Sequence, residues 1–260
     1  MLSSYIVPHI TGRYDFTLAS IALPEVVVRA LLPQEWASQP DLFLTSEDLR
    51  FPLPDIEDGM SWVCVEAGKQ IETGMAGVPG GKRTFFEAKL EIPFLRHPNR
   101  AAAPFTFKHT MLFSSRMMAF SSANITGLRS HRVAITQSTS EYEATGFLGL
   151  VEEAAAAVSD NVKWAEELAR KVLEGWWVGE NTGDVATRFH MTSLSPAQPR
   201  HNLLVRLNLP ALLRQPHESV FALVGPTALK MDAAGWVELP AAGFAFNEET
   251  RMEAGRVDSL

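Results

Sequence analysis

Apolar and polar residues alternate with a period of two in several parts of the chain, and residues 85–92 show the pattern most clearly. The even positions of this segment are apolar, whereas the odd positions carry Phe85, Glu87, Lys89 and Glu91. Because successive side chains of a β-strand point to opposite faces, this period predicts a strand with one buried face. We expect the other face to be solvated, with Lys89 paired to the glutamates beside it.

Further strand signals recur along the chain. They lie at residues 14–21, 61–65, 105–113, 203–207, 220–224 and 228–231, and residues 132–140 and 142–148 suit the two arms of a hairpin. Pro24 is expected to open a short helix that ends before Pro33. After residue 65, five glycines are expected to divide the chain into turns; they are Gly68, Gly74, Gly77, Gly80 and Gly81.

One segment has the period of a helix. Within residues 151–174, apolar residues recur at helical spacing and charged residues lie largely on the other side. Ser159 could cap a second helical segment together with the aspartate after it, so the stretch forms either one helix or two. Gly175 marks its end, and we interpret the two tryptophans that follow as core residues. The helical segment thus covers about residues 151–177.

Strands dominate and do not alternate regularly with helices, so the pattern indicates an α+β fold with much antiparallel sheet. Residues 117–120 are apolar and suit either a strand or a helix. The chain contains no internal repeat and no linker rich in Gly, Ser or Pro that would divide it. We therefore predict a single domain over residues 1–260.

The composition argues against several classes of partner. Of the 260 residues, 46% are hydrophobic and 20% are charged, which is typical of a globular domain with a sizeable core. The formal net charge of -7 argues against binding to nucleic acids or anionic membranes. Cys64 is the single cysteine, so no internal disulfide can form. The chain shows no signal-peptide pattern and no apolar run near the roughly 18 residues that span a bilayer. These features predict a soluble cytoplasmic protein.

The common sequence motifs of catalysis and cofactor binding do not occur. We find no G-x-S-x-G, H-E-x-x-H, G-x-G-x-x-G or G-x-x-x-x-G-K-[ST], which argues against the familiar hydrolase, zinc protease and nucleotide-binding classes. The glycine-rich stretch at residues 74–82 is followed by a strand and is better interpreted as a loop. The seven histidines show no metal-ligand spacing. We expect neither a metal nor a cofactor.

Four stretches in the same order carry a resemblance to a known family. They are CVEAGKQI at residues 64–71 followed by GMAGVPGG at 74–81, GRYDF at 12–16 with LLP at 31–33, LRF at 49–51, and the closing GPTAL at 225–229, ELP at 238–240 and GRV at 255–257. Together they resemble the signature segments of the acetoacetate decarboxylase family. The resemblance covers most of residues 12–135 and 220–257.

The resemblance implies a strongly curved, mostly antiparallel β-sheet that forms a partly closed barrel or cone around a pocket, with flanking helices. In that family a neutral lysine amine forms a Schiff base with a keto substrate, and the iminium accepts the electrons released as carbon dioxide leaves. The best match to the lysine segment is residues 117–130, where Arg129 takes the lysine position and Ser130 that of its partner. Arginine stays protonated and forms no imine. Pro52 replaces a second glutamate, so we predict that the pocket is retained without the imine chemistry.

Four residues are candidates for the site. The resemblance implies that Glu66 is a pocket carboxylate acting as acid or base, and that Arg13 anchors a substrate carboxylate or enolate. Arg129 could bind an enolate oxygen in place of the imine, and His109, if it points into the sheet, could act as a general acid or base. The alternatives stay open: an exposed strand-end glutamate, surface arginines paired with acids, and a hydrogen-bonded core histidine.

The lysines are few, at seven against sixteen arginines. Lys108 alternates with threonines on the more polar face of its predicted strand, and it lies nearest the relevant segment. It is therefore the first alternative for a relocated Schiff-base lysine. Lys89, on the face expected to be solvated, shows no reason to be desolvated.

These observations lead to three hypotheses. The first is an acetoacetate decarboxylase-like enzyme, a lyase acting on a small or medium carbonyl metabolite such as a β-keto acid or polyketide of secondary metabolism. It would use lyase, cyclisation or enolate chemistry without a Schiff base or cofactor. The second is Schiff-base decarboxylation through a relocated lysine, and the third is a non-catalytic pocket that binds a hydrophobic metabolite. Analogy with the family implies a homo-oligomer.

Overall fold

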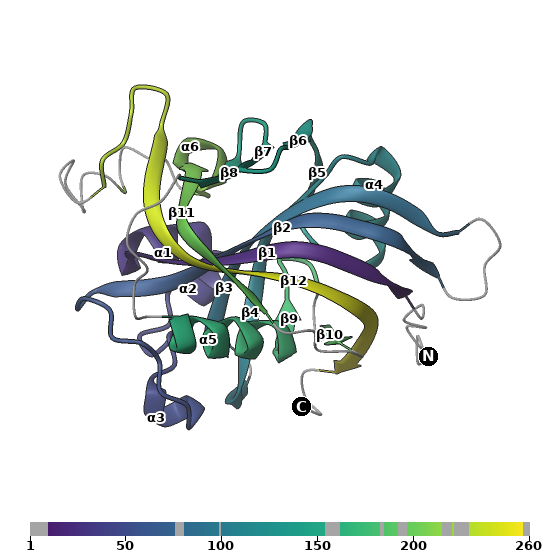
Figure 1. Cartoon of the computed structure of the whole chain (residues 1–260). Helices are drawn as coiled ribbons and strands as arrows, with labels where there is room; N and C mark the ends of the chain where they lie inside the picture. Colours follow the sequence, from purple (N-terminus) through teal and green to yellow (C-terminus); the bar gives the residue numbers. More distant parts are fainter. Residues whose placement is uncertain are drawn as a thin grey trace.

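The computed structural model of the chain describes residues 10–75, 81–98, 100–153, 162–182, 185–191, 197–214, 220 and 229–256 (Figure 1). Its strands are β1 (Ile10–Pro24), β2 (Met60–Met75), β3 (Arg83–His97), β4 (Arg100–Phe113), β5 (Ser130–Arg132), β6 (Ile135–Gln137), β7 (Glu141–Ala144), β8 (Leu148–Glu152), β9 (Trp176–Val178), β10 (Val185–Met191), β11 (Gln198–Asn208) and β12 (Trp236–Arg256). Its helices are α1 (Glu25–Leu31), α2 (Gln34–Ala37), α3 (Ser46–Leu49), α4 (Arg116–Ile125), α5 (Val162–Glu174) and α6 (Leu209–Leu212).

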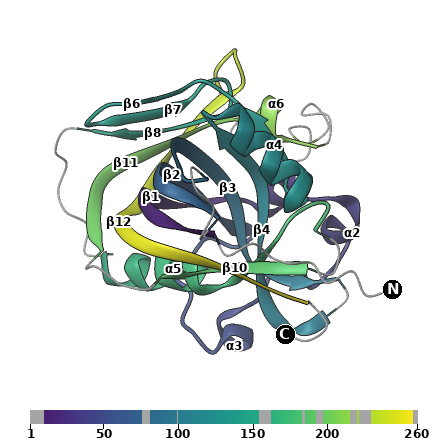
Figure 2. The same ribbon diagram turned by 90° about the vertical axis from the view of Figure 1, so that its right-hand side faces the viewer.

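The strands form one sheet that curves back on itself. They pair in the order β1-β2-β3-β4-β9-β10-β12-β11-β8-β7-β6, and β12 also pairs with β1. The strands from β1 to β12 in this order therefore form a ring, which Figure 2 shows roughly end-on. The ring is weakest at β9, which joins β10 through the pair Thr187–Trp177. The predicted fold class, a strongly curved and mostly antiparallel sheet forming a partly closed barrel, is confirmed.

Helices cover both sides of the curved sheet. After Pro24, α1 runs to Leu31, and its next residue is extended because Pro33 follows it. Helices α1 and α2 pack on the outer face with Val28, Leu31 and Trp36 in the largest apolar cluster. Helix α5 lies along the inner side, below β12 and β9 in Figure 1. Its apolar face, which the sequence predicts, carries Leu168, Ala169, Val172 and Leu173 into a second cluster with Tyr14, Phe16 and Phe246.

The predicted turns after residue 65 are wrong in part, because β2 runs without a turn through Gly68 and Gly74 to Met75. Gly68 lies within β2 and allows the curved strands β1 and β2 to approach each other closely. A Cβ atom there would lie 2.2 Å from the carbonyl oxygen of Asp15 and 2.5 Å from the Cα of Phe16. Only glycine allows the backbone of β1 to approach β2 this closely. Gly77 and Gly80 lie outside the described residues.

Other predicted elements are mostly confirmed. The hairpin is present as β6 and β7, and the strands near residues 14–21, 105–113 and 203–207 are β1, β4 and β11. The ambiguous residues 117–120 belong to α4. The helix predicted over about residues 151–177 begins too early and ends too late, because residues 151–152 end β8 and residues 176–177 belong to β9. Within the described residues the helix is α5. The strand predicted at residues 220–224 lies almost wholly outside the described residues. The strand predicted at 228–231 is wrong for the described residues 229–231, where only Met231 forms an isolated bridge, with Val237.

Among the described residues, no helix is long and apolar enough to cross a membrane.

Candidate active site

A row of buried charges crosses the inner face of the ring. Glu66 on β2 lies directly opposite Lys89 on β3, and its carboxylate forms an ion pair with the Lys89 ammonium. The same ammonium lies 2.8 Å from an oxygen of Glu87. The Lys89 side chain is 1% exposed and the two glutamate side chains are 4% exposed, so these three charged side chains are almost completely shielded from solvent. Gln70 donates a hydrogen bond of 2.9 Å to Glu87.

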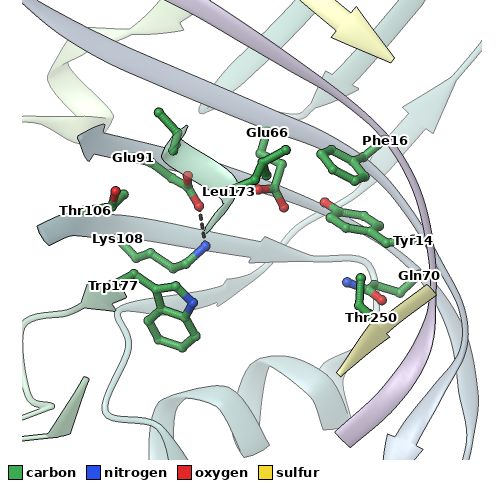
Figure 3. Close-up of a pocket in the computed structure, with 11 residues that line it drawn as sticks. Tyr14, Phe16, Glu66, Gln70, Glu91, Thr106, Lys108, Leu173, Trp177 and Thr250 are labelled. Carbon is green, nitrogen blue, oxygen red and sulfur yellow. Dashed lines mark hydrogen bonds and ion pairs between the residues drawn. The ribbon is translucent and has the colours of Figure 1, made fainter. Parts of the chain in front are cut away.

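A second ion pair lies beside the first. Glu91 on β3 lies opposite Lys108 on β4, and the Lys108 ammonium pairs with the Glu91 carboxylate (Figure 3). The ammonium also lies 5.0 Å from the centre of the Trp177 ring, within the range of a cation–π contact. Side-chain exposure is 4% for Lys108 and 2% for Glu91. Lys108 is thus held between a carboxylate and an aromatic face.

The predicted solvated face of residues 85–92 is wrong. Both faces of β3 are buried, since the even positions face the outer cluster and the odd positions face the interior of the ring. Alternation predicts correctly which residues share a face, but curvature decides whether water reaches that face. The interior accepts Lys89 because carboxylates of β2 and β3 compensate its charge. Lys89 is therefore a desolvated lysine, contrary to expectation.

A β-bulge places Lys108 in the same interior. Thr110 pairs with Leu90 and Lys108 pairs with Glu91, so His109 is an extra residue on β4. The extra residue reverses the phase of alternation. His109 and Thr110 share the outer side, where the Thr110 hydroxyl lies 2.8 Å from Nδ1 of His109. Lys108 therefore shares a face with Glu91. Simple alternation predicts instead that it shares a face with Thr110.

The two ion pairs border a narrow pocket. Its polar lining residues are Tyr14, Glu66, Gln70, Glu91, Thr106, Lys108 and Thr250. Val172 and Leu173 of α5 form the apolar wall, with Phe16 and Trp177. The cavity volume is about 20 Å³, which is room for about one water molecule. An organic ligand therefore fits only if side chains that line the cavity move.

Tyr14 presents a hydroxyl group to this pocket. Figure 3 shows the hydroxyl pointing toward the carboxylate of Glu66. The hydroxyl is fully buried, and the Glu66 carboxylate is the acceptor that it faces. Burial and the carboxylates of Glu66 and Glu87 raise the pKa of Tyr14 well above its usual value, so the hydroxyl keeps its proton. Tyr14 is therefore a proton donor on the pocket wall, directed at Glu66.

The electrostatics distinguish the two lysines and their partners. Burial opposes the charge on Lys89, but Glu66, Glu87 and Glu91 outweigh it and raise the pKa of Lys89. Burial also opposes the charge on Glu66, yet Lys89 and Lys108 hold the pKa of Glu66 below its usual value. Burial raises the pKa of Glu91, with Glu66 adding to the effect and Lys108 opposing it. Lys89 thus stays charged, and Glu91 is the carboxylate most ready to accept a proton.

The structure does not bring all four predicted site residues together. Glu66 lines the pocket. Arg13 is exposed on the outer side of β1, whereas the residues on either side of it, Gly12 and Tyr14, face inward. Its guanidinium donates a hydrogen bond to Asn247. An exposed arginine on that side does not reach a ligand beside Glu66. Its predicted role as an anchor therefore has no support in this placement.

His109 and Arg129 lie together, away from the pocket. A guanidinium nitrogen of Arg129 is 3.4 Å from Nε2 of His109 and 3.4 Å from the carbonyl oxygen of Leu212. Burial, Arg129 and Arg214 lower the pKa of His109 well below its usual value, which keeps the imidazole neutral. This is the hydrogen-bonded core histidine that the sequence left open. Neither residue is among those that line the pocket.

Sequence reasoning missed Tyr14, Glu91 and Trp177 as site residues. One available signal was the Glu-x-Lys-x-Glu row of β3 in front of Glu66, because three charges in one strand can neutralise one another inside a barrel. Nothing local marked Tyr14 or Trp177. Among the described residues, no group of three or more His, Cys, Asp or Glu side chains is arranged to hold a metal ion.

The curved sheet, the partly closed ring and the pocket inside it define an acetoacetate decarboxylase-like fold. The structure of acetoacetate decarboxylase from Legionella pneumophila is similar, with a TM-score of 0.52 and 11% identity over 94% of this chain and 84% of that one. The enduracididine biosynthesis enzyme MppR, complexed with the condensation product of pyruvate and imidazole 4-carboxaldehyde, has a TM-score of 0.52 and 9% identity over 98% of this chain and 92% of that one. No protein-family model and no curated protein matches the sequence. The predicted resemblance is confirmed for the fold.

Proposed function

We propose that the protein is an enzyme that forms an imine between Lys108 and a small carbonyl compound. The observation that carries the proposal is the buried Lys108–Glu91 pair inside the pocket. This choice favours the relocated lysine over the imine-free chemistry, because Arg13 and Arg129 do not line the pocket. Two solved structures with the same fold are described as enzymes by their names, acetoacetate decarboxylase and MppR, which supports catalysis here.

The first step is activation of the amine. Only a neutral amine attacks a carbonyl, so Lys108 must give up a proton. Glu91 is in direct contact with the ammonium and its pKa is raised by burial, so it is the acceptor. Burial favours this transfer, because it converts an ion pair into two neutral groups. Lys89 is unsuited to the same role, because three carboxylates keep its proton in place.

The second step is addition and loss of water. The Lys108 nitrogen attacks the carbonyl carbon, and the Tyr14 hydroxyl donates a hydrogen bond to the oxygen on which negative charge develops. A proton passes from the nitrogen to this oxygen, which gives a neutral carbinolamine. Glu91 then returns its proton to the hydroxyl group, the C–O bond breaks, water leaves, and the nitrogen lone pair forms the C=N bond of an iminium on Lys108. The narrow, largely apolar wall from α5 excludes further water.

The test is reductive trapping. Incubating the protein with small ketones, aldehydes and keto acids and then with sodium borohydride is expected to leave a stable adduct, and peptide mass mapping should place it on Lys108. Glu91→Gln should form the adduct about 10²–10⁴-fold more slowly, because glutamine accepts no proton. Lys69→Gln, on the opposite face of β2, is the matched control and should form it at the normal rate. Adducts confined to other lysines, or none with any probe, would refute the proposal.

A further inference from the structure

The pocket holds more carboxylates than cations. Three glutamates, Glu66, Glu87 and Glu91, contact Lys89 or Lys108, and each of the five side chains is at most 4% exposed. Among these five side chains, acidic groups therefore outnumber basic ones by one.

The cations present are already engaged. Lys89 is held by two glutamates, and Lys108 becomes the imine nitrogen, with Glu91 beside it. Lys108 is the one cationic side chain among the described residues that line the pocket. Arg13 is exposed on the outer side, and Arg129 contacts His109 outside the pocket. Among the described residues, a substrate carboxylate beside the iminium would thus face Glu66 and Glu91, and no further lysine or arginine lines the pocket to pair with it.

We infer that the substrate is a carbonyl compound without a carboxylate, that is, an uncharged or cationic ketone or aldehyde. This inference rests on the proposed imine at Lys108 and adds the charge class of its substrate. Burying an unpaired anion is costly, and neighbouring carboxylates add repulsion that the low dielectric of the pocket strengthens. An uncharged oxygen, in contrast, is received by the hydroxyl of Tyr14 or the amide of Gln70.

The charge class also changes the chemistry. Without a carboxylate no carbon dioxide leaves, so the iminium acts by acidifying the neighbouring C–H bond. That bond breaks, its proton passes to the Glu91 carboxylate, and its electron pair forms a C=C bond while C=N⁺ becomes C–N. The product is an enamine on Lys108. In D₂O the reverse step returns a deuteron to carbon, so α-hydrogen exchange reports this reaction.

The test uses two probes of nearly equal shape, acetoacetamide and acetoacetate, which differ in charge. With the wild-type protein, the rate constant of borohydride trapping at Lys108 is expected to be at least about 100-fold higher with acetoacetamide than with acetoacetate. Glu66→Gln should reduce this preference about tenfold, because it removes one of the repelling charges. Exchange of the α-hydrogens of acetone in D₂O should accompany the preference.

The outcomes separate this inference from the proposed function. Equal or faster trapping of acetoacetate at Lys108, with release of carbon dioxide, overturns the charge class and leaves the imine intact. No adduct at Lys108 with either probe refutes the imine and the inference with it. The primary measurement needs no variant, so misfolding of Glu66→Gln does not affect it.

Discussion

Replacing Lys89 by methionine removes the cation that compensates two buried carboxylates. Methionine has a similar length, so the change removes charge with little loss of volume. Breaking a buried ion pair by deleting one partner costs about 3–5 kcal/mol. Gln70 still donates to Glu87, and Lys108 still acts on Glu66, so we expect the lower end, about 3 kcal/mol. For a chain of this size that lowers Tm by about 6–12 °C.

The assay is urea unfolding followed by circular dichroism at neutral and mildly acidic pH. In the variant, Glu66 loses the Lys89 charge that opposes the effect of burial, so its folded-state pKa rises above the unfolded one. The deficit is then fully present above that raised pKa and shrinks as the pH falls toward the unfolded value. Wild type behaves oppositely at Glu66: its lowered pKa contributes stability above the unfolded pKa, which is lost as the pH falls through the folded one.

Lys69→Met is the control, because Lys69 lies one strand away from Lys89 and its ammonium is partly exposed over the ring of Phe86 at 5.6 Å. It should change the unfolding free energy by no more than about 1 kcal/mol. The triple variant with Glu66→Gln and Glu87→Gln should recover much of the loss, since no buried charge is left unpaired. If Lys89→Met costs no more than Lys69→Met and its cost does not vary with pH, the buried ion network is refuted.

Two further predictions concern the bulge and the curvature. His109→Gln should destabilise the protein by an amount that shrinks as the pH falls from about 7.5 to about 5.5. The reason is that the lowered pKa keeps His109 neutral in the folded wild type. Below the pKa of an unfolded histidine, the wild type therefore loses stability that the variant does not lose, by at most about 1.4 kcal/mol per pH unit. A constant deficit in urea titrations would contradict this. Gly68→Ala should cost about 2 kcal/mol or more and slow trapping at Lys108, because its Cβ would meet the backbone of β1 at 2.2 Å. Gly149→Ala, whose nearest contact is 3.2 Å, is the milder comparison, and equal losses in calorimetry would argue against the close approach.

Local pattern predicted the strands and the helix well where the period is long and regular. Strands β1, β4 and β11 and the apolar face of α5 follow from it, because alternation and helical spacing are properties of consecutive residues. The closing of the ring does not follow in the same way. It depends on β12 pairing with β1, between segments more than two hundred residues apart.

The candidate site was predictable only in part. Glu66 was found through the family resemblance, and Lys108 stood as the alternative lysine. The phase of β4 was misjudged, because one extra residue at His109 changes the face of every residue beyond it. Arg129, placed at the lysine position by the alignment of short motifs, contacts His109 instead of the pocket.

The sequence by itself determined which residues share a strand face, and it placed Glu87, Lys89 and Glu91 in one row. Only the tertiary structure decided that this row faces the inside of a curved sheet. The physical reason is that alternation specifies orientation relative to the local strand, whereas burial depends on what the rest of the chain places over that face. Here α5 and the opposite strands exclude water, and so a row that looks like a solvated surface becomes the charged centre of a pocket.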